Sequence, residues 1–181
     1  MKTDEIKIVN MVISVDFADK VDLNKVANTL ENTEYAPEQF PGLVYRIKDP
    51  KSAVLIFSSG RMNCTGTKSM KDAGKVIRTV IKEMKDLGFK VKKPTITVQN
   101  IVAVASLGKK VDLDEILQLE NSEYEPQQFP GLVYRMKEPK VAFLIFTSGK
   151  VVETGSKDEE MMVNAYKKLK KKLKEIGALR H

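Results

Sequence analysis

The chain has 181 residues, of which 42% are apolar and 30% are charged, a composition typical of a soluble globular protein with one large domain or two small ones. The single cysteine, Cys64, excludes an internal disulfide and fits a reducing, cytoplasmic location. Because the only histidine is the last residue, His181, Ser-His-Asp and Cys-His catalytic sites are excluded, and neither a metal nor another cofactor is expected.

The net charge is +7 and is shared by both halves, with +3 in residues 1–90 and +4 in residues 91–181. This distribution favours either a polyanionic ligand that touches both halves or a generally basic surface. No apolar run approaches the roughly 18 residues of a membrane span, and residues 1–5 lack the apolar segment of a signal peptide. We therefore expect neither a membrane anchor nor secretion.

Residues 1–90 are predicted to contain two helices and several strands. A β-branched run at 6–15 indicates a strand, and apolar residues at helical spacing over 19–30 indicate a helix. Three more strands, separated by turns, are expected at 43–48, 53–58 and 61–65. Apolar residues at i, i+3, i+4 and i+7 over 69–87 indicate a second helix, which ends at Gly88.

Residues 91–181 show the same order of elements. The predicted strands are 95–105, 132–137, 141–147 and 151–154, and the predicted helices are 111–119 and 157–176. The short segments 34–35 and 123–124 would add one strand to each half. The sum is about ten strands and four main helices in an α+β arrangement with mostly hairpin connections.

The repetition extends to the residues themselves. Phe-Pro-Gly-Leu-Val-Tyr-Arg occurs at 40–46 and again at 129–135, and Leu-Ile-Phe followed by Ser-Gly occurs at 55–60 and 144–149. Thr65-Gly66 returns as Thr154-Gly155, and Asn10 corresponds to Asn100. Two repeats, residues 1–90 and 91–181, are therefore expected to join in one pseudo-twofold structure.

Two of the predicted strands are apolar on both faces. Consecutive apolar residues occupy 54–57 and 143–146, whereas a sheet with helices on one face should alternate apolar and polar residues. Four helices can cover only one face of so wide a sheet. The second face is then covered by a second copy of the chain, enclosed within the fold, or open for binding a ligand.

These duplicated motifs, together with Gln-Asn-Ile-Val at 99–102, resemble the TATA-binding protein family over residues 6–177. The absence of a long N-terminal extension resembles the archaeal branch of this family. The resemblance implies a saddle-shaped, curved antiparallel sheet of ten strands, with four main helices on its convex face. It also implies that the concave face binds double-stranded DNA, in the minor groove of a TATA element, and bends it.

The resemblance implies a set of residues that read the minor groove, and these are Asn10, Val12, Leu55, Asn63, Thr65, Asn100, Val102, Leu144, Val152 and Thr154. An apolar face with no acceptor for the guanine amino group selects A·T pairs by exclusion. Two phenylalanine pairs, Phe40 with Phe57 and Phe129 with Phe146, would wedge into one base step at each end of the site. Asn63 departs from the apolar residue that the family usually has at its position.

Further DNA-binding residues implied by the resemblance are Arg46, Ser59, Arg61, Lys68, Arg135, Ser148, Lys150 and Lys157, and the cations among them would contact phosphate. The lysine-rich segment 167–174 fits either a solvated basic helix face or an amphipathic helix on a membrane, and its apolar residues are sufficient for packing on a sheet.

The function that the resemblance implies is that of a general transcription initiation factor, not an enzyme. A transcription factor B-type protein would dock on a loop containing Glu125, Gln127 and Gln128, and would recruit RNA polymerase. Two alternatives stay open. The same repeat occurs in some DNA glycosylases as a non-catalytic part, although no catalytic segment follows here, and an apolar sheet face could instead join two copies of the chain into a homodimer when DNA is absent.

Overall fold

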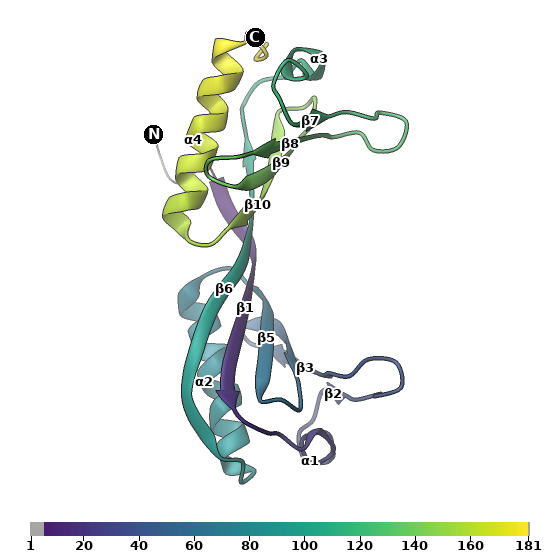
Figure 1. Cartoon of the computed structure of the whole chain (residues 1–181), viewed down its shortest axis with the longest axis vertical. Coiled ribbons are helices and arrows are strands. Elements are labelled where there is room, and N and C mark those ends of the chain that lie inside the picture. The colour runs from purple at the N-terminus through teal and green to yellow at the C-terminus, as the bar shows by residue number, and fades with distance from the viewer. Residues whose placement is uncertain (1–5, 181) are drawn as a thin grey trace. The chain divides into compact units, whose positions relative to one another are not determined.

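The computed structural model describes residues 6–180, so the N-terminal segment considered for a signal peptide and the histidine at 181 lie outside it. In chain order, the elements of the first repeat are β1 (Ile6–Ala18), α1 (Leu23–Thr29), β2 (Thr33–Glu34), β3 (Leu43–Lys48), β4 (Lys51–Ile56), β5 (Arg61–Thr67) and α2 (Met70–Asp86) (Figure 1). Those of the second repeat are β6 (Val91–Ser106), α3 (Leu113–Ile116), β7 (Ser122–Glu123), β8 (Leu132–Met136), β9 (Val141–Ile145), β10 (Lys150–Ser156) and α4 (Glu159–Glu175).

All ten strands belong to one sheet, in the order β2-β3-β4-β5-β1-β6-β10-β9-β8-β7. Every pairing with a defined register is antiparallel. The order of strands in one half mirrors the order in the other, with β1 and β6 in the middle. The described residues thus confirm the predicted α+β class, the ten-stranded antiparallel sheet and the four helices.

By spatial contact the chain divides into two compact units. The first unit is residues 10–99, and the described part of the second unit is residues 6–9 and 100–180. The boundary differs from that of the sequence repeats because β1 starts in the second unit and continues into the first, while β6 does the reverse. Each unit thus contains one long helix and the strands of one repeat, apart from this exchange.

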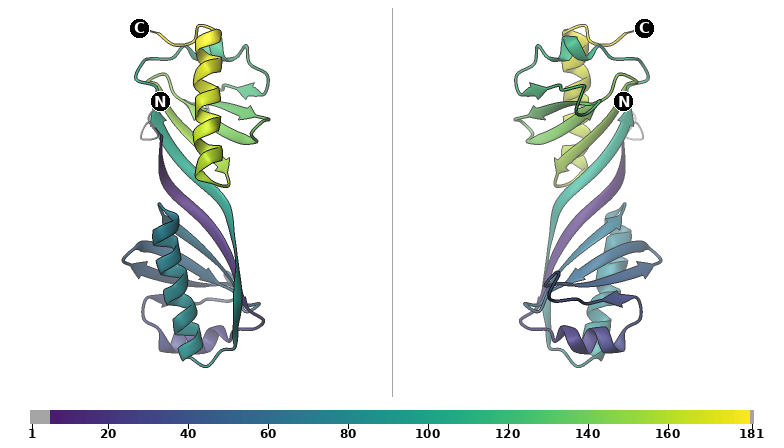
Figure 2. Two further views of the ribbon diagram at one scale, coloured as in Figure 1. Left: turned by 90° about the vertical axis from the view of Figure 1, so that its left-hand side faces the viewer. Right: turned by 90° about the vertical axis from the view of Figure 1, so that its right-hand side faces the viewer.

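The long helices pack through one apolar side on the strands of their own unit (Figure 2). In the first unit, α2 contacts β5 and buries Ala73, Val76, Ile77, Val80 and Met84. Its first turn is capped by Ser69, whose hydroxyl accepts a hydrogen bond from the backbone N–H of Asp72. In the second unit α4 contacts β10, and Asp158 caps α4 by accepting from the N–H of Met161.

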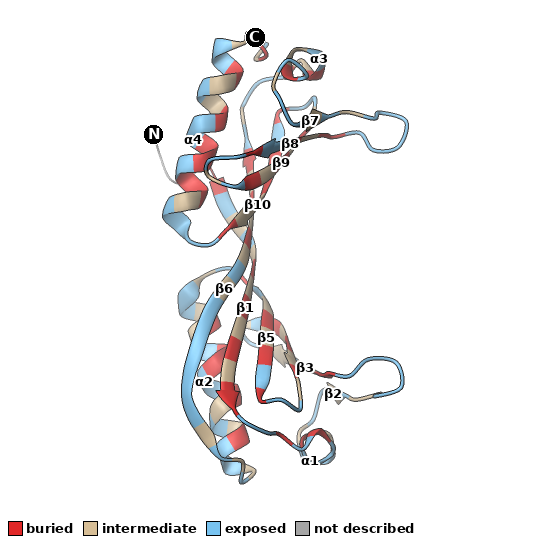
Figure 3. Cartoon of the chain, viewed as in Figure 1, coloured by how far each residue is buried: buried red, intermediate tan, exposed pale blue. Residues whose placement is uncertain are grey.

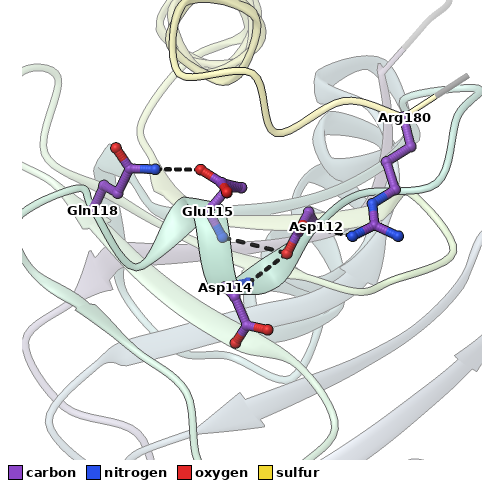
Figure 4. A network of polar contacts seen from close by, with 5 residues as sticks. All are labelled: Asp112, Asp114, Glu115, Gln118 and Arg180. Carbon is purple, nitrogen blue, oxygen red and sulfur yellow. Dashed lines mark hydrogen bonds and ion pairs between the residues drawn. The ribbon is translucent and has the colours of Figure 1, made fainter.

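The helix predicted over 111–119 is only one turn long. After Ile116 the N–H groups of Gln118 and Leu119 donate to carbonyls three residues back, and the start of the helix is fixed by other contacts. Val111 forms a β-bridge with Leu179, and Asp112 caps α3 by accepting from the N–H groups of Asp114 and Glu115. The Arg180 guanidinium also donates to the Asp112 carboxylate, at 2.6 Å, and holds the pKa of that carboxyl below its ordinary value (Figure 4). The C-terminal residues thereby tie the start of α3 to the second unit.

The other short helix also begins later than predicted. Residues 19–22 stay outside α1, since the N–H of Val21 donates to the carbonyl of Ser58 and the side chain of Asp22 caps the helix. The remaining predicted strands and helices are present, with ends that differ by a few residues.

Candidate nucleic-acid interface

Within each unit the strands turn one side toward the long helix and leave the other side open. In the first unit Val54, Ile56 and Met62 are fully buried on the helix side, while Leu55 and Asn63, which alternate with them, are only half-buried. The second unit repeats this pattern, with Phe143 and Ile145 buried and Leu144 half-buried (Figure 3). The strands predicted to be apolar on both faces are therefore covered on one face only by the described residues.

We call the uncovered side of each unit its open face. The first open face is formed by Val12, Ser14, Val44, Ala53, Leu55, Asn63 and Thr65, and the second by Val102, Val104, Val133, Ala142, Leu144, Val152 and Thr154. These side chains are adjacent because their residues are cross-strand partners. Leu55, for example, lies between Val44 and Asn63, and Leu144 lies between Val133 and Val152.

A β-bulge holds an asparagine beside the first open face. Gly66, which has φ +104°, is left out of the pairing of β1 with β5. Its backbone N–H donates to Oδ1 of Asn10 at 2.7 Å instead. An N–H group needs an acceptor, so this bond identifies the amide oxygen and leaves the NH₂ group as the donor. The NH₂ group of Asn10 donates one of its two hydrogens to Oγ1 of Thr65, at 3.2 Å.

The second unit has the same arrangement. Gly155, with φ +115°, lies at the corresponding bulge of β10 and donates to Oδ1 of Asn100 at 2.6 Å. The NH₂ group of Asn100 donates to Oγ1 of Thr154 at 2.8 Å. Among the described residues, the second N–H of each amide has no acceptor. These bonds explain why Thr-Gly is repeated together with the asparagine, although the glycine and the asparagine lie 56 residues apart in the first unit and 55 in the second.

The four predicted phenylalanines form two matching pairs. The ring centroids of Phe40 and Phe57 are 6.0 Å apart, those of Phe129 and Phe146 are 5.8 Å apart, and both pairs meet edge to face. Phe40 and Phe129 are 41% and 40% exposed, so neither is an ordinary core residue. Each stands in a loop that joins two strands and projects away from the long helix of its unit (Figure 1).

The glycine of each Phe-Pro-Gly motif permits this ring packing. A Cβ atom on Gly42 would lie 2.7 Å from the Phe40 ring and 2.9 Å from the Phe57 ring. A Cβ atom on Gly131 would meet Phe129 and Phe146 at the same distances. Any side chain at these positions would displace the rings, so the sequence motif is explained by the aromatic pair.

The predicted cationic residues surround the open faces at exposed positions. In the first unit these are Arg46 on β3, Arg61 at the start of β5 and Lys68 just after β5, and in the second unit Arg135 on β8, Lys150 at the start of β10 and Lys157 just after β10. The two arginines on β3 and β8 have acidic partners across the strand pair, since Arg46 lies 3.1 Å from Glu34 and Arg135 lies 3.7 Å from Glu123. Ser59 and Ser148 occupy exposed turns before β5 and β10.

The predicted partner-binding residues Glu125, Gln127 and Gln128 are all exposed in the loop between β7 and β8, next to Phe129. The carbonyl of Glu125 accepts from the N–H groups of Gln128 and Phe129, both at 2.9 Å, which gives the loop a defined turn. The corresponding turn before Phe40 is closed by the carbonyl of Ala36 in the same way.

Behind the second open face lies a buried carboxyl group. Glu153 stands between Val152 and Thr154 on β10, points toward the helix side and is 1% exposed. Its Oε2 accepts from the hydroxyl of Ser156 at 2.8 Å, and within the described residues its Oε1 has no hydrogen-bond partner. Burial raises the pKa of this carboxyl to about 7, whereas its counterpart Cys64 is a buried thiol whose pKa burial raises to about 11.

Sequence reasoning missed several residues of this surface. Ser14, Val44, Val104 and Val133 belong to the open faces, and Gly66 and Gly155 fix the asparagines. Strand alternation from Asn10 would have found Ser14, which is four residues further along the same strand.

Among the described residues, no helix has the length and apolar character needed to cross a membrane.

Comparison with known proteins identifies relatives of this chain. The family model for transcription factor TFIID (or TATA-binding protein) matches twice, at residues 5–87 and 95–176, in agreement with the two repeats. The TATA-box-binding protein of Methanocaldococcus jannaschii is 55% identical over 177 residues, which are 97% of each chain. That of Picrophilus torridus is 51% identical over 180 residues and covers 97% of this chain and 98% of its own length.

A solved structure agrees with these relatives. The structure described as Methanococcus jannaschii TBP superposes with a TM-score of 0.88 at 56% identity, over 94% of this chain and 99% of the other. The similarity in sequence and structure therefore extends over nearly the whole chain, both open faces included.

Proposed function

The chain belongs to the family of transcription factor TFIID, or TATA-binding protein, and from that membership we propose that it is a general transcription initiation factor that binds the minor groove of a TATA element. The family consists of DNA-binding transcription factors and not of enzymes. The observation that carries the proposal is the pair of open faces, each of which combines apolar side chains with a fixed asparagine donor.

The chemistry of the open faces matches the minor groove of A·T-rich DNA. Adenine and thymine present only acceptors there, whereas guanine adds an amino group. The free N–H of Asn10 in the first unit and that of Asn100 in the second would each donate to such an acceptor. The valines and leucines would exclude the guanine amino group, because they offer it no acceptor.

The phenylalanine pairs would bend the bound DNA. Wedge insertion and strong kinking in the minor groove are known properties of this protein family. Phe57 and Phe146 adjoin the open faces, and the exposed rings of Phe40 and Phe129 pack against them. Unstacking a base step costs free energy, which the larger contact area of bent DNA offsets, while the cations around each face neutralise phosphates and set affinity.

The bent complex would then present a docking surface to other proteins. A transcription factor B-type partner would contact the loop with Glu125, Gln127 and Gln128, which is exposed and has a defined turn. RNA polymerase would join through that partner. The protein would act in the cytoplasm, on the chromosome.

The proposal is tested by competition binding at fixed salt, with an A·T-rich duplex against duplexes changed at single central pairs. Replacement of A·T by G·C should cost about 1–3 kcal/mol per pair, and replacement by T·A should cost less. Equal penalties for the two changes would show that the minor-groove edge is not read. Sedimentation with and without the duplex tests the alternative, because a homodimer that covers its own open faces would not bind DNA until it dissociates.

A further inference from the structure

The two open faces differ in polarity at one equivalent pair of positions. In the first unit Asn63 on β5 is the direct cross-strand partner of Ser14 on β1. In the second unit the corresponding partners are Val152 on β10 and Val104 on β6. The neighbour on the other side is a leucine in both units, Leu55 or Leu144, so among the residues that form the two open faces the difference lies in this pair.

From this difference we propose that the first unit accepts a G·C base pair beneath Asn63 and Ser14, whereas the second unit rejects G·C at the equivalent position. The inference rests on the proposed binding of the minor groove and adds a sequence preference to it. The protein would then take TATA elements that carry a G·C pair in one half, and would orient itself on them accordingly.

Asn63 and Ser14 can each form a further hydrogen bond with a base. Asn63 is half-buried, and within the described residues its amide forms no hydrogen bond with another protein group. The hydroxyl of Ser14 accepts from Nε2 of Gln99 at 2.8 Å, which leaves its own O–H as a donor. The Oδ1 of Asn63 can therefore accept from the guanine amino group, and the Ser14 hydroxyl can donate to a base acceptor beside it.

The valine pair has no such capacity. A guanine amino group pressed against Val152 and Val104 would lose its hydrogen bonds to water without replacement. At an A·T pair nothing is lost, because adenine has no amino group in the minor groove. A half-buried amide held over A·T can rotate to donate to adenine N3 or thymine O2, so Asn63 tolerates both kinds of pair.

A palindromic A·T duplex tests this inference without any need to know how the protein is oriented. Each pair of one half is changed to G·C in turn, then the symmetric pair of the other half, then both together. Inosine·C duplexes serve as the control, because inosine lacks the minor-groove amino group. The protein variants are Asn63→Val with Ser14→Val, which copies the second unit onto the first, and Val152→Asn with Val104→Ser, which does the opposite. Circular dichroism checks that each variant is folded.

At one of the tested pairs, the one that lies beneath Asn63 and Ser14, the wild-type protein should tolerate G·C in either half, because it can turn its first unit toward the change. At that pair it should lose about tenfold or more in affinity when both halves carry G·C, whereas at the other pairs a single G·C already weakens binding. The Asn63→Val, Ser14→Val variant should already lose that factor with a single G·C. The Val152→Asn, Val104→Ser variant, if folded, should tolerate both. Inosine·C should be tolerated throughout.

Two results would overturn the inference while the proposed function stands. One is a full penalty in the wild type for a single G·C at every pair that is tested, and the other is identical penalties at every pair in the wild type and the Asn63→Val, Ser14→Val variant. If the wild type binds the A·T duplex no better than duplex DNA of random sequence, the proposed function itself fails, and the inference fails with it.

Discussion

The backbone N–H of Gly66 and the side-chain oxygen of Asn10 are joined by a 2.7 Å hydrogen bond that determines which way the amide points. Glycine is required at this bulge, because φ is +104° there and a Cβ atom would lie 3.2 Å from the Cα of Ser52. The bond turns an ambiguous amide into a donor of fixed direction, and the same device operates on Asn100 in the second unit.

Asn10→Asp tests this assignment. A carboxylate would still accept from the N–H of Gly66, so the fold should be kept. Its second oxygen would replace the donor and would face the base acceptors, so binding to an A·T duplex should weaken by about tenfold or more. Asn100→Asp should behave alike. Binding is measured by fluorescence anisotropy and folding by thermal unfolding, and unchanged affinity in both folded variants would refute the donor role.

Phe57→Ala and Phe146→Ala should each reduce the bend of the DNA and weaken binding. The wedge is lost in these variants, while the cations around the open face stay in place. Energy transfer between dyes on the two duplex ends measures the bend. Phe89→Ala is the matched control, since Phe89 contacts Lys25 and belongs to neither pair. A wild-type bend in both wedge variants would remove the assignment.

The sequence pattern predicts the order of elements along the chain, and the family resemblance implies the ten-stranded antiparallel sheet with one uncovered face. Val54 and Leu55 lie on opposite sides of one strand, so the alternation alone assigns them to different faces. The exchange of β1 and β6 between the units could not be predicted in this way. It depends on which residues lie close together within each unit, and no local pattern records that.

The cross-strand partners of individual side chains could not be predicted from the sequence either. Asn63 was recognised as unusual, but its partner Ser14 lies 49 positions away and became visible only through the register of β1 and β5. The hydrogen bond between Asn10 and Gly66 likewise requires the bulge that the register reveals. The helix predicted over 111–119 is longer than α3, and the ion pair of Asp112 with Arg180 before its first turn joins segments that are distant in the chain, which no local pattern records.

The buried Glu153 should make the stability of the protein depend on pH in a defined direction. Burial raises the pKa of its carboxyl from 4.5 to about 7, so the native state holds a proton that the unfolded state releases between these values. The free energy of unfolding should therefore fall as the pH rises from about 4.5 to about 7. Glu153→Gln removes this contribution, and the variant should gain stability relative to the wild type as the pH increases.

Urea unfolding of both proteins between pH 4.5 and pH 8 measures the effect. Only the difference between wild type and variant is interpreted, because other groups titrate in the same range. Glu160→Gln, an exposed change at the start of α4, is the matched control for replacing a glutamate outside the core. A difference for Glu153→Gln that stays constant with pH would show that this carboxyl is not protonated in the native state.

The salt dependence of binding should identify which cations touch phosphate. Lys150 is exposed at the start of β10, beside the second open face, and should neutralise one phosphate when DNA is bound. Lys150→Ala should lower the slope of log K against log salt concentration by about 0.9, and should weaken A·T and G·C-containing duplexes by the same factor. Phosphate contacts carry no base information, so the sequence preference should not change.

The lysines of α4 supply the comparison for this experiment. Lys174 is exposed on the last turn of α4, a helix that packs on the face of the sheet opposite the second open face. If DNA binds only the open faces, Lys174→Ala should leave the salt slope unchanged, although it removes the same charge from the protein. Two outcomes would contradict a phosphate contact of Lys150. In one, the slope of log K against log salt concentration is the same for Lys150→Ala and the wild type; in the other, Lys174→Ala reduces that slope as much as Lys150→Ala does. Either would mean that the basic charge acts through the general field of the protein and not through contacts beside the open face.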